Sequence, residues 1–197
     1  MTRSEKKHIA MIAAAKNEFI ERGFLAANMD SICTRAEVSK RTLYRHFESK
    51  AVLFQAVLGE IQLTVDDTVD YPFDNALSLY TQLTALTYKE VDILYCTYGL
   101  ALSKTIIMEF LREPELAKSV ISTVYATRGI SKWFAEAIQH GKIKQTNATE
   151  ITEVYNSLFQ GFFLWPQLMQ HKPIPEGLEL EQKISTVVSV VLNAYQQ

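Results

Sequence analysis

The chain has 197 residues, of which 48% are apolar, and a formal net charge of −2 at pH 7; this composition excludes a disordered chain and fits one or two small folded domains. No apolar run approaches the roughly 20 residues of a membrane-spanning helix, and the first residues lack the apolar stretch of a signal peptide, so we expect a cytoplasmic protein without a membrane segment. The cations are concentrated in residues 1–60, which carry +3 while residues 61–197 carry −5, as binding to DNA phosphates would require.

Residues 4–22 predict the first helix, because apolar residues recur there at helical spacing and Gly23 stands where a helix commonly ends. The segment that precedes it, residues 2–7, carries three cations. This segment is either an arm that touches DNA or a solvated terminus.

The next stretch predicts two short helices joined by a tight turn. Asn28 can cap the first helix and Ser39 the second, because both side chains accept a hydrogen bond from an unpaired backbone amide. Leu43 and Phe47 lie four residues apart on the apolar stripe of the second helix, which leaves its basic side chains facing outward. We therefore predict a helix-turn-helix over about residues 28–47, a motif whose second helix reads the DNA major groove.

A longer helix follows from Ser49, and its apolar stripe continues to about Val65. The three helices before it have too few inner side chains for an independent core, so we expect this fourth helix to support both domains. The predicted division is residues 6–66 for a DNA-binding domain and residues 67–197 for a helical C-terminal domain.

The chain beyond Pro72 carries helical patterns only. Asp74 or Asn75 can cap a helix that runs to about Tyr88, and residues 91–111 are apolar on most of their circumference, which predicts a buried helix. Helical periodicity continues in three later stretches, which are residues 114–140, 147–163 and 184–195. The predicted fold is therefore all-α, with about nine helices and a small DNA-reading domain joined to a larger bundle.

The order of residues between Gly23 and Phe54 is more specific than its helical pattern. It includes the run Ala36-Glu-Val-Ser-Lys-Arg-Thr-Leu-Tyr-Arg-His-Phe-Glu-Ser-Lys50, and it closely resembles the amino-terminal domain of the tetracycline-repressor (TetR) family. That family normally has Gly in the turn where this chain has Glu37, and a small residue such as Ala where it has Cys33. The resemblance implies a helix-turn-helix domain joined to a C-terminal bundle that binds a ligand and forms a dimer.

The resemblance also implies which side chains meet DNA. Arg and Lys pair with guanine edges and phosphates, Thr reaches phosphate or base, and a Tyr ring can touch a thymine methyl group. The first turn of the first short helix would present backbone amides to a phosphate. The candidates for DNA contact are Asn28, Met29, Lys40, Arg41, Thr42, Tyr44, His46 and Lys50. For Tyr44, packing inside the core is the alternative.

A single helix-turn-helix reads only a few base pairs, so we expect a homodimer on double-stranded DNA with a pseudo-palindromic operator. The resemblance implies that the last two helices pack against their two-fold mates. The alternative is that the same apolar side chains form the core of one chain. The candidate interface residues are Tyr155, Leu158, Phe159, Phe162, Val187, Val188, Val191 and Tyr195.

The middle helices imply, again by resemblance, a pocket for a small effector. Residues 91–111 carry little charge, which favours a largely apolar or aromatic ligand over a polyanion. For each single residue, ordinary packing is the alternative. The candidate pocket residues are Tyr95, Tyr98, Met108, Phe110, Trp133, Phe163 and Trp165.

No pattern in the sequence indicates catalysis, a metal or a cofactor, since Cys33 and Cys96 lie far apart and the four histidines form no pair at ligand spacing. The favoured function is a DNA-binding transcriptional regulator, a homodimeric repressor that a small ligand releases from its operator. One alternative is an architectural or replication-linked DNA-binding protein without an inducer, and a third is an all-α enzyme. Ligand-dependent release from DNA would separate the first two, and sequence-specific DNA binding without turnover would argue against the third.

Overall fold

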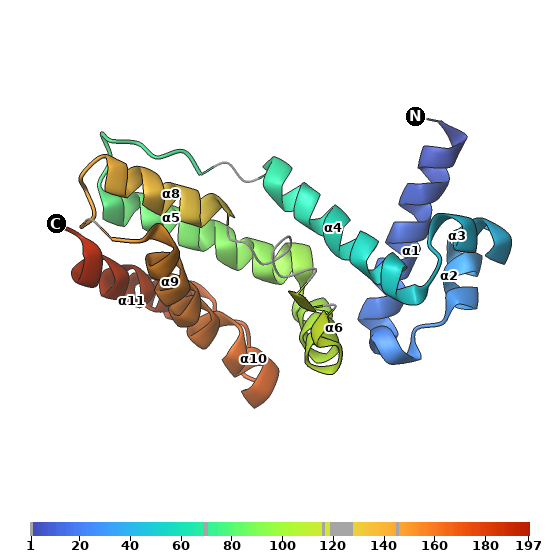
Figure 1. Ribbon diagram of the computed structural model, residues 1–197. Helices are drawn as coiled ribbons and strands as arrows, with labels where there is room; N and C mark the ends of the chain where they lie inside the picture. Colours follow the sequence, from blue (N-terminus) through green and yellow to red (C-terminus); the bar gives the residue numbers. More distant parts are fainter. Residues whose placement is uncertain (1, 69–70, 116, 119–127, 145) are drawn as a thin grey trace. The chain divides into compact units, whose positions relative to one another are not determined.

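The computed structural model describes residues 2–68, 71–115, 117–118, 128–144 and 146–197, and in these residues every named element is a helix (Figure 1). The predicted all-α fold is confirmed. The chain forms two compact units, residues 1–65 with 101–126 and residues 66–100 with 127–197. The first stretch of the first unit ends beside the boundary expected after residue 66. The described residues of 101–118 group by packing with the N-terminal helices, whereas the sequence analysis placed them in the C-terminal domain.

The first unit holds the described helices α1 (Arg3–Ala26), α2 (Met29–Arg35), α3 (Lys40–His46), α4 (Lys50–Thr68) and α6 (Leu100–Arg112) (Figure 1). Thr2 caps α1 in a capping box with Glu5, so the basic residues before Ile9 are helical and not an extended arm. Gly23 breaks the regular helix with φ of 72°, as the sequence predicted.

Aromatic packing joins the end of α1 to α4 and α6. The rings of Phe19 and Phe54 are both fully buried and meet edge to face, with their centroids 5.0 Å apart. Thr105 of α6 donates from its hydroxyl to the carbonyl oxygen of Phe19 at 3.3 Å. The Arg112 guanidinium lies over the ring of Phe24, 5.5 Å from its centroid. Helix α6 is therefore part of the core that supports the helix-turn-helix.

The turn between α2 and α3 keeps its shape without glycine. Glu37 adopts the left-handed conformation, with φ of 53°, and Val38 N–H donates to the carbonyl oxygen of Cys33 at 3.0 Å. A residue with a Cβ pays about 1–2 kcal/mol in this conformation. Glu37 therefore holds the left-handed conformation that Gly would adopt there without strain.

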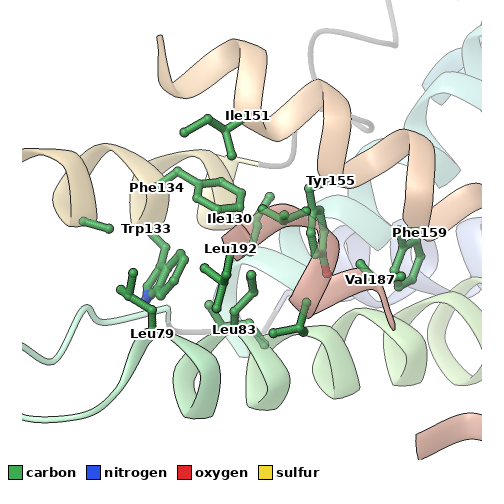
Figure 2. Packing of buried hydrophobic residues seen from close by; sticks show 14 of the residues in the cluster. Leu79, Leu83, Ile130, Trp133, Phe134, Ile151, Tyr155, Phe159, Val187 and Leu192 are labelled. Atoms are coloured by element: carbon green, nitrogen blue, oxygen red, sulfur yellow. The ribbon is translucent and has the colours of Figure 1, made fainter. Parts of the chain in front are cut away.

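The second unit contains the described helices α5 (Leu79–Asp92), α8 (Arg128–Gln139), α9 (Ala148–Phe163), α10 (Trp165–Gln170) and α11 (Gly177–Tyr195), and the π-helical segment η1 (Ile93–Tyr98). Figure 2 shows Leu83 of α5, Trp133 and Phe134 of α8, Tyr155 of α9 and Leu192 of α11 pointing into one apolar cluster. Four helices thus share a single core in this unit.

Two details of the second unit differ from expectation. Ser78, and not Asp74 or Asn75, caps α5, because the Asp74 carboxylate instead accepts from the backbone N–H of Ala76. Residues 91–111 are not one buried helix, since the chain passes through η1 and then breaks at Gly99, whose φ is 73°. Periodicity alone could not locate this break, because the residues on both sides of it are apolar.

Candidate nucleic-acid interface

Helix α3 has one buried side and one basic exposed side. Leu43 and Phe47 are buried against the rest of the first unit. Arg41 and Arg45, four residues apart, are exposed on a neighbouring row with Tyr44, so they present their guanidinium groups on one face. Tyr44 is 48% exposed, which decides against the core alternative for its ring. Arg45 was not among the predicted contacts, although its i+4 spacing from Arg41 was a usable signal.

Two other candidates on α3 have partners in the free protein. Lys40 Nζ lies 2.7 Å from Asp30 Oδ1 of α2, and this hydrogen bond raises the pKa of the Lys40 ammonium. The Thr42 hydroxyl lies 2.9 Å from the hydroxyl of Ser39, which caps α3. Exposed ion pairs contribute little, so Lys40 can exchange Asp30 for a phosphate at small cost.

The amino terminus of α2 is held by a buried carboxylate. Glu18 of α1 is fully buried, and its oxygens accept from the backbone N–H of Asn28 at 3.1 Å and from the Ser31 hydroxyl at 2.7 Å. Asn28 caps α2 by accepting from the backbone N–H of Asp30, as predicted. Met29 begins the helix and is partly exposed. No pattern in the sequence singles out Glu18, because its partners in α2 are ten or more residues away.

Two arginines complete this cluster around Glu18. Arg22 Nε lies 3.2 Å from one carboxylate oxygen and Arg35 Nε lies 3.8 Å from the other. Arg35 also pairs with Glu21, which lowers the pKa of the Glu21 carboxyl. The ion pairs of Arg35 with Glu18 and Glu21 therefore tie α2 to α1.

Lys50 has a structural role that differs from the phosphate contact implied by resemblance. Its ammonium donates to the carbonyl oxygens of Leu25 at 2.9 Å and Ala27 at 3.1 Å, at the end of α1, and lies 4.9 Å from the centroid of the Phe24 ring. Burial lowers the pKa of Lys50. To reach a phosphate, Lys50 would have to leave carbonyl groups that end a helix unpaired.

His46 ends α3 beside a histidine of α1 that the sequence did not single out. The ring centroids of His46 and His8 are 5.9 Å apart, and both side chains are partly exposed. Burial, followed by the nearby cations, lowers the pKa of His46. No spacing rule links residues 8 and 46, so only the folded chain brings them together.

Comparison with known families accounts for nearly the whole chain. The family described as "Bacterial regulatory proteins, tetR family" matches residues 11–57, and the one described as "AefR-like transcriptional repressor, C-terminal domain" matches residues 81–197. The chain belongs to the TetR family. It is therefore a helix-turn-helix transcriptional regulator, and the relatives it matches are regulators and not enzymes.

Individual relatives agree with this assignment. The chain is 46% identical over 69 residues to the transcriptional activator FasR of Mycolicibacterium smegmatis, a match that covers 35% of this chain and 30% of FasR. It is 26% identical over 153 residues to the regulator UidR of Escherichia coli, which covers 77% of this chain and 76% of UidR. The solved structure of the flavonoid-responsive regulator FrrA superimposes with a TM-score of 0.78 at 25% identity and covers 98% of both chains.

The structure reduces the number of predicted interface residues that could contact a second chain in a TetR-type dimer. Five of the eight predicted interface residues are buried inside the single chain, so they have no surface left for a partner. These five are Tyr155, Phe159, Val187, Val188 and Val191. Only Leu158, Phe162 and Tyr195 remain partly exposed. The alternative reading, that this apolar stripe is core, holds for the five.

The seven predicted effector contacts are divided between the two units. Met108 and Phe110 belong to the first unit and the other five to the second. Trp133 and Phe163 are fully buried in the core, and Trp133 donates from its indole N–H to Gln82. Met108 and Trp165 are exposed, at 58% and 38%. Tyr95 and Tyr98 lie in η1 and are partly exposed.

The described residues were also compared with the requirements of a metal site, a membrane-spanning helix and a ligand pocket. Among the described residues, no group of three or more His, Cys, Asp or Glu side chains is placed to hold a metal ion. In the same part of the chain no single helix is long and apolar enough to cross a membrane, although α5 with η1 and α6 reach that length together as a bent pair. An open depression of about 220 Å³ is lined by none of the predicted effector residues but by Leu77, Ser78, Leu79, Gly141, Lys142, Gln196 and Gln197.

Proposed function

We propose that this TetR-family regulator binds a pseudo-palindromic operator as a homodimer in the cytoplasm, and that a small, largely apolar effector releases it. The observation that carries the DNA part is the exposed basic face of α3, opposite its buried Leu43 and Phe47. On this proposal Arg41 contacts a base edge, because an exposed guanidinium can pair bidentately with guanine. Lys40, Thr42, Tyr44 and Arg45 contact bases or the backbone beside it.

The first expected result concerns Arg41→Ala. It should cost about 1–3 kcal/mol of operator binding, or about 5–150-fold in Kd, and change binding to random duplex much less. The measurement is a fluorescence-anisotropy titration of operator and scrambled duplex at several salt concentrations. Lys132→Ala removes an exposed charge from α8 and is the matched control, which should change neither affinity.

The variant Lys50→Ala, measured in the same titration, tests whether Lys50 contacts a phosphate. Because its ammonium is bound to Leu25 and Ala27, we expect lower stability of the first unit and a salt slope equal to that of the unmodified protein. A slope reduced by about 0.9 would instead assign Lys50 to a phosphate. If Arg41→Ala weakens binding to operator and to scrambled DNA by the same factor, Arg41 does not contact a base.

The homodimer proposal rests on the outward face of α9. Ser157 and Gly161 lie four residues apart on this face and are exposed, and a Cβ added at Gly161 would meet nothing within 4 Å. Small residues let two helices approach closely, and the partly exposed Leu158 and Phe162 flank them. We therefore propose that α9, with the exposed side of α11, packs against a second copy of the chain.

The effector proposal centres on η1 in the second unit. All but one of its six residues are only partly buried, and Cys96 is exposed; π-helical segments are frequent at binding sites. The Tyr95 hydroxyl donates to the carbonyl oxygen of Phe163 at 2.6 Å, and burial raises the pKa of Tyr95 to about 12. Tyr95 is thus a neutral phenol that packs against the apolar core cluster, which suits an aromatic ligand, and FrrA is a flavonoid-responsive relative in fold.

A flavonoid that stabilises the protein in a thermal-shift screen should bind less tightly once operator is present. Because coupling is reciprocal, its Kd should rise by about 5–150-fold at saturating operator, the same factor by which it weakens operator binding. Calorimetric titration with and without operator measures this factor. An equal ligand Kd in both titrations would contradict release by the effector, and would favour a DNA-binding protein without an inducer.

A further inference from the structure

His46, a predicted DNA contact, forms a pair with His8, which the family resemblance did not single out. His8 belongs to α1 and His46 to the end of α3, and both rings also lie beside Phe47, with centroids 5.2 Å and 6.2 Å from its ring. Phe47 is buried, so it fixes the position of both imidazoles against the first unit. The two partly exposed rings therefore form a preorganised pair at one edge of α3.

The charged groups that act on His46 have one sign. The charged groups that act on His46 are Arg45 of its own helix and His8 and Lys7 of α1, and each of them lowers the pKa of His46. The acids nearest in sequence are Glu5 and Glu48. The Glu5 carboxylate accepts from the Thr2 backbone N–H, and Glu48 is an exposed residue beyond Phe47. A site with four cationic or protonatable groups, and no acid acting on His46, favours an anion.

We propose that His8 and His46 form a proton-linked site for one DNA backbone phosphate, so that operator affinity increases as the pH falls. The inference rests on the proposed placement of α3 against DNA. In the free protein the cations around His46 and its partial burial favour the neutral imidazole at pH 7. A phosphate placed beside the two rings favours their charged form, and each newly protonated ring then adds a charge-assisted hydrogen bond.

The direction of the pH effect follows from linkage. A bound phosphate would raise the pKa of His46, so the complex would hold more protons than the free protein at pH values between the pKa of His46 in the free protein and its pKa in the complex. Binding therefore strengthens as the pH falls through the bound pKa, and the gain is complete below the free pKa. A rise of one pKa unit gives up to about tenfold in affinity for each histidine.

The test uses the full chain and its selected operator at about pH 8 and about pH 6, on either side of the usual histidine pKa. We expect the affinity of the unmodified protein to rise about tenfold or more on acidification, and that of the His8→Gln/His46→Gln double variant to rise less than about twofold. His171→Gln removes an exposed histidine of the second unit and should keep the full rise. Helical circular dichroism checks that each variant is folded.

A second measurement does not depend on the variants. Histidine NMR titration of the unmodified protein should give a higher pKa for His46 with operator than without it. Tight operator binding with the same pH dependence in the unmodified protein and the double variant would overturn the inference alone, as would an unchanged pKa of His46. Failure to bind any operator at both pH values would overturn the proposed function and this inference with it.

Discussion

Val188→Glu is expected to unfold the second unit, and not merely to split a dimer. Val188 and its neighbour Val191 have no exposed surface and lie in the core cluster that α5, α8, α9 and α11 share. An unpaired carboxylate there costs about 5 kcal/mol or more, which is comparable to the whole stability of a small unit. Circular dichroism should show lost helix, and urea unfolding should show a lost or greatly weakened transition.

Two exposed positions give matched controls for this result. Val190→Glu places the same charge two residues along the same helix, at a side chain that is 45% exposed, and should leave the protein folded. Gly161→Arg places a large charged side chain on the proposed two-fold face of α9, where the single chain has room for it. Light scattering should find Gly161→Arg folded but monomeric, with operator affinity reduced to that of one half-site. If Gly161→Arg remains dimeric, the dimer interface does not include this face of α9.

Glu18→Ala should strongly destabilise the first unit. It removes the fully buried carboxylate that accepts from Asn28 N–H and the Ser31 hydroxyl, and leaves two donors unpaired and a small cavity. We expect a loss of about 3 kcal/mol in the free energy of unfolding. Because these donors fix the start of α2, operator affinity should fall at temperatures where the variant is still folded.

Glu21→Ala is the matched control for Glu18→Ala. Glu21 also pairs with Arg35, but its side chain is 50% exposed, so solvent replaces what the substitution removes. The effect on unfolding should be much smaller. Equal losses for the two variants, measured by urea unfolding, would mean that the buried hydrogen bonds of Glu18 do not hold α2 in place.

Local chemistry made the helix ends predictable from sequence. Asn28, Ser39, Ser49 and Asn147 all accept from a backbone amide at the start of the expected helix. A cap depends on one side chain and on amides two or three residues further on, so it needs no knowledge of the fold. The failure at α5 is of the same local kind, since three residues, Asp74, Asn75 and Ser78, could each serve as its cap.

The roles of several side chains depend on residues far away in the sequence, and these roles could not be predicted from local patterns. The apolar stripe of α11 is typical of a core as much as of a dimer face, and only the packing of α5 and α8 against it shows that Val187 and Val188 are core. Lys50 looks like a phosphate contact until the end of α1 is placed beside it. Glu18 and His8 gained their roles from residues 10 to 38 positions away, a separation that no helical spacing rule covers.

The exposed basic face of α3 and the proposed two-fold dimer together predict the symmetry of the target, and selection from a random duplex library tests that prediction most directly. The full chain should enrich an inverted repeat whose half-site centres lie about 34–36 Å apart, one turn of DNA, or a multiple of that distance. The Arg41→Ala variant should lose the preference at one symmetric pair of positions and keep it elsewhere. No enrichment, or enrichment of a single site without two-fold symmetry, would contradict a dimeric regulator that reads DNA through α3.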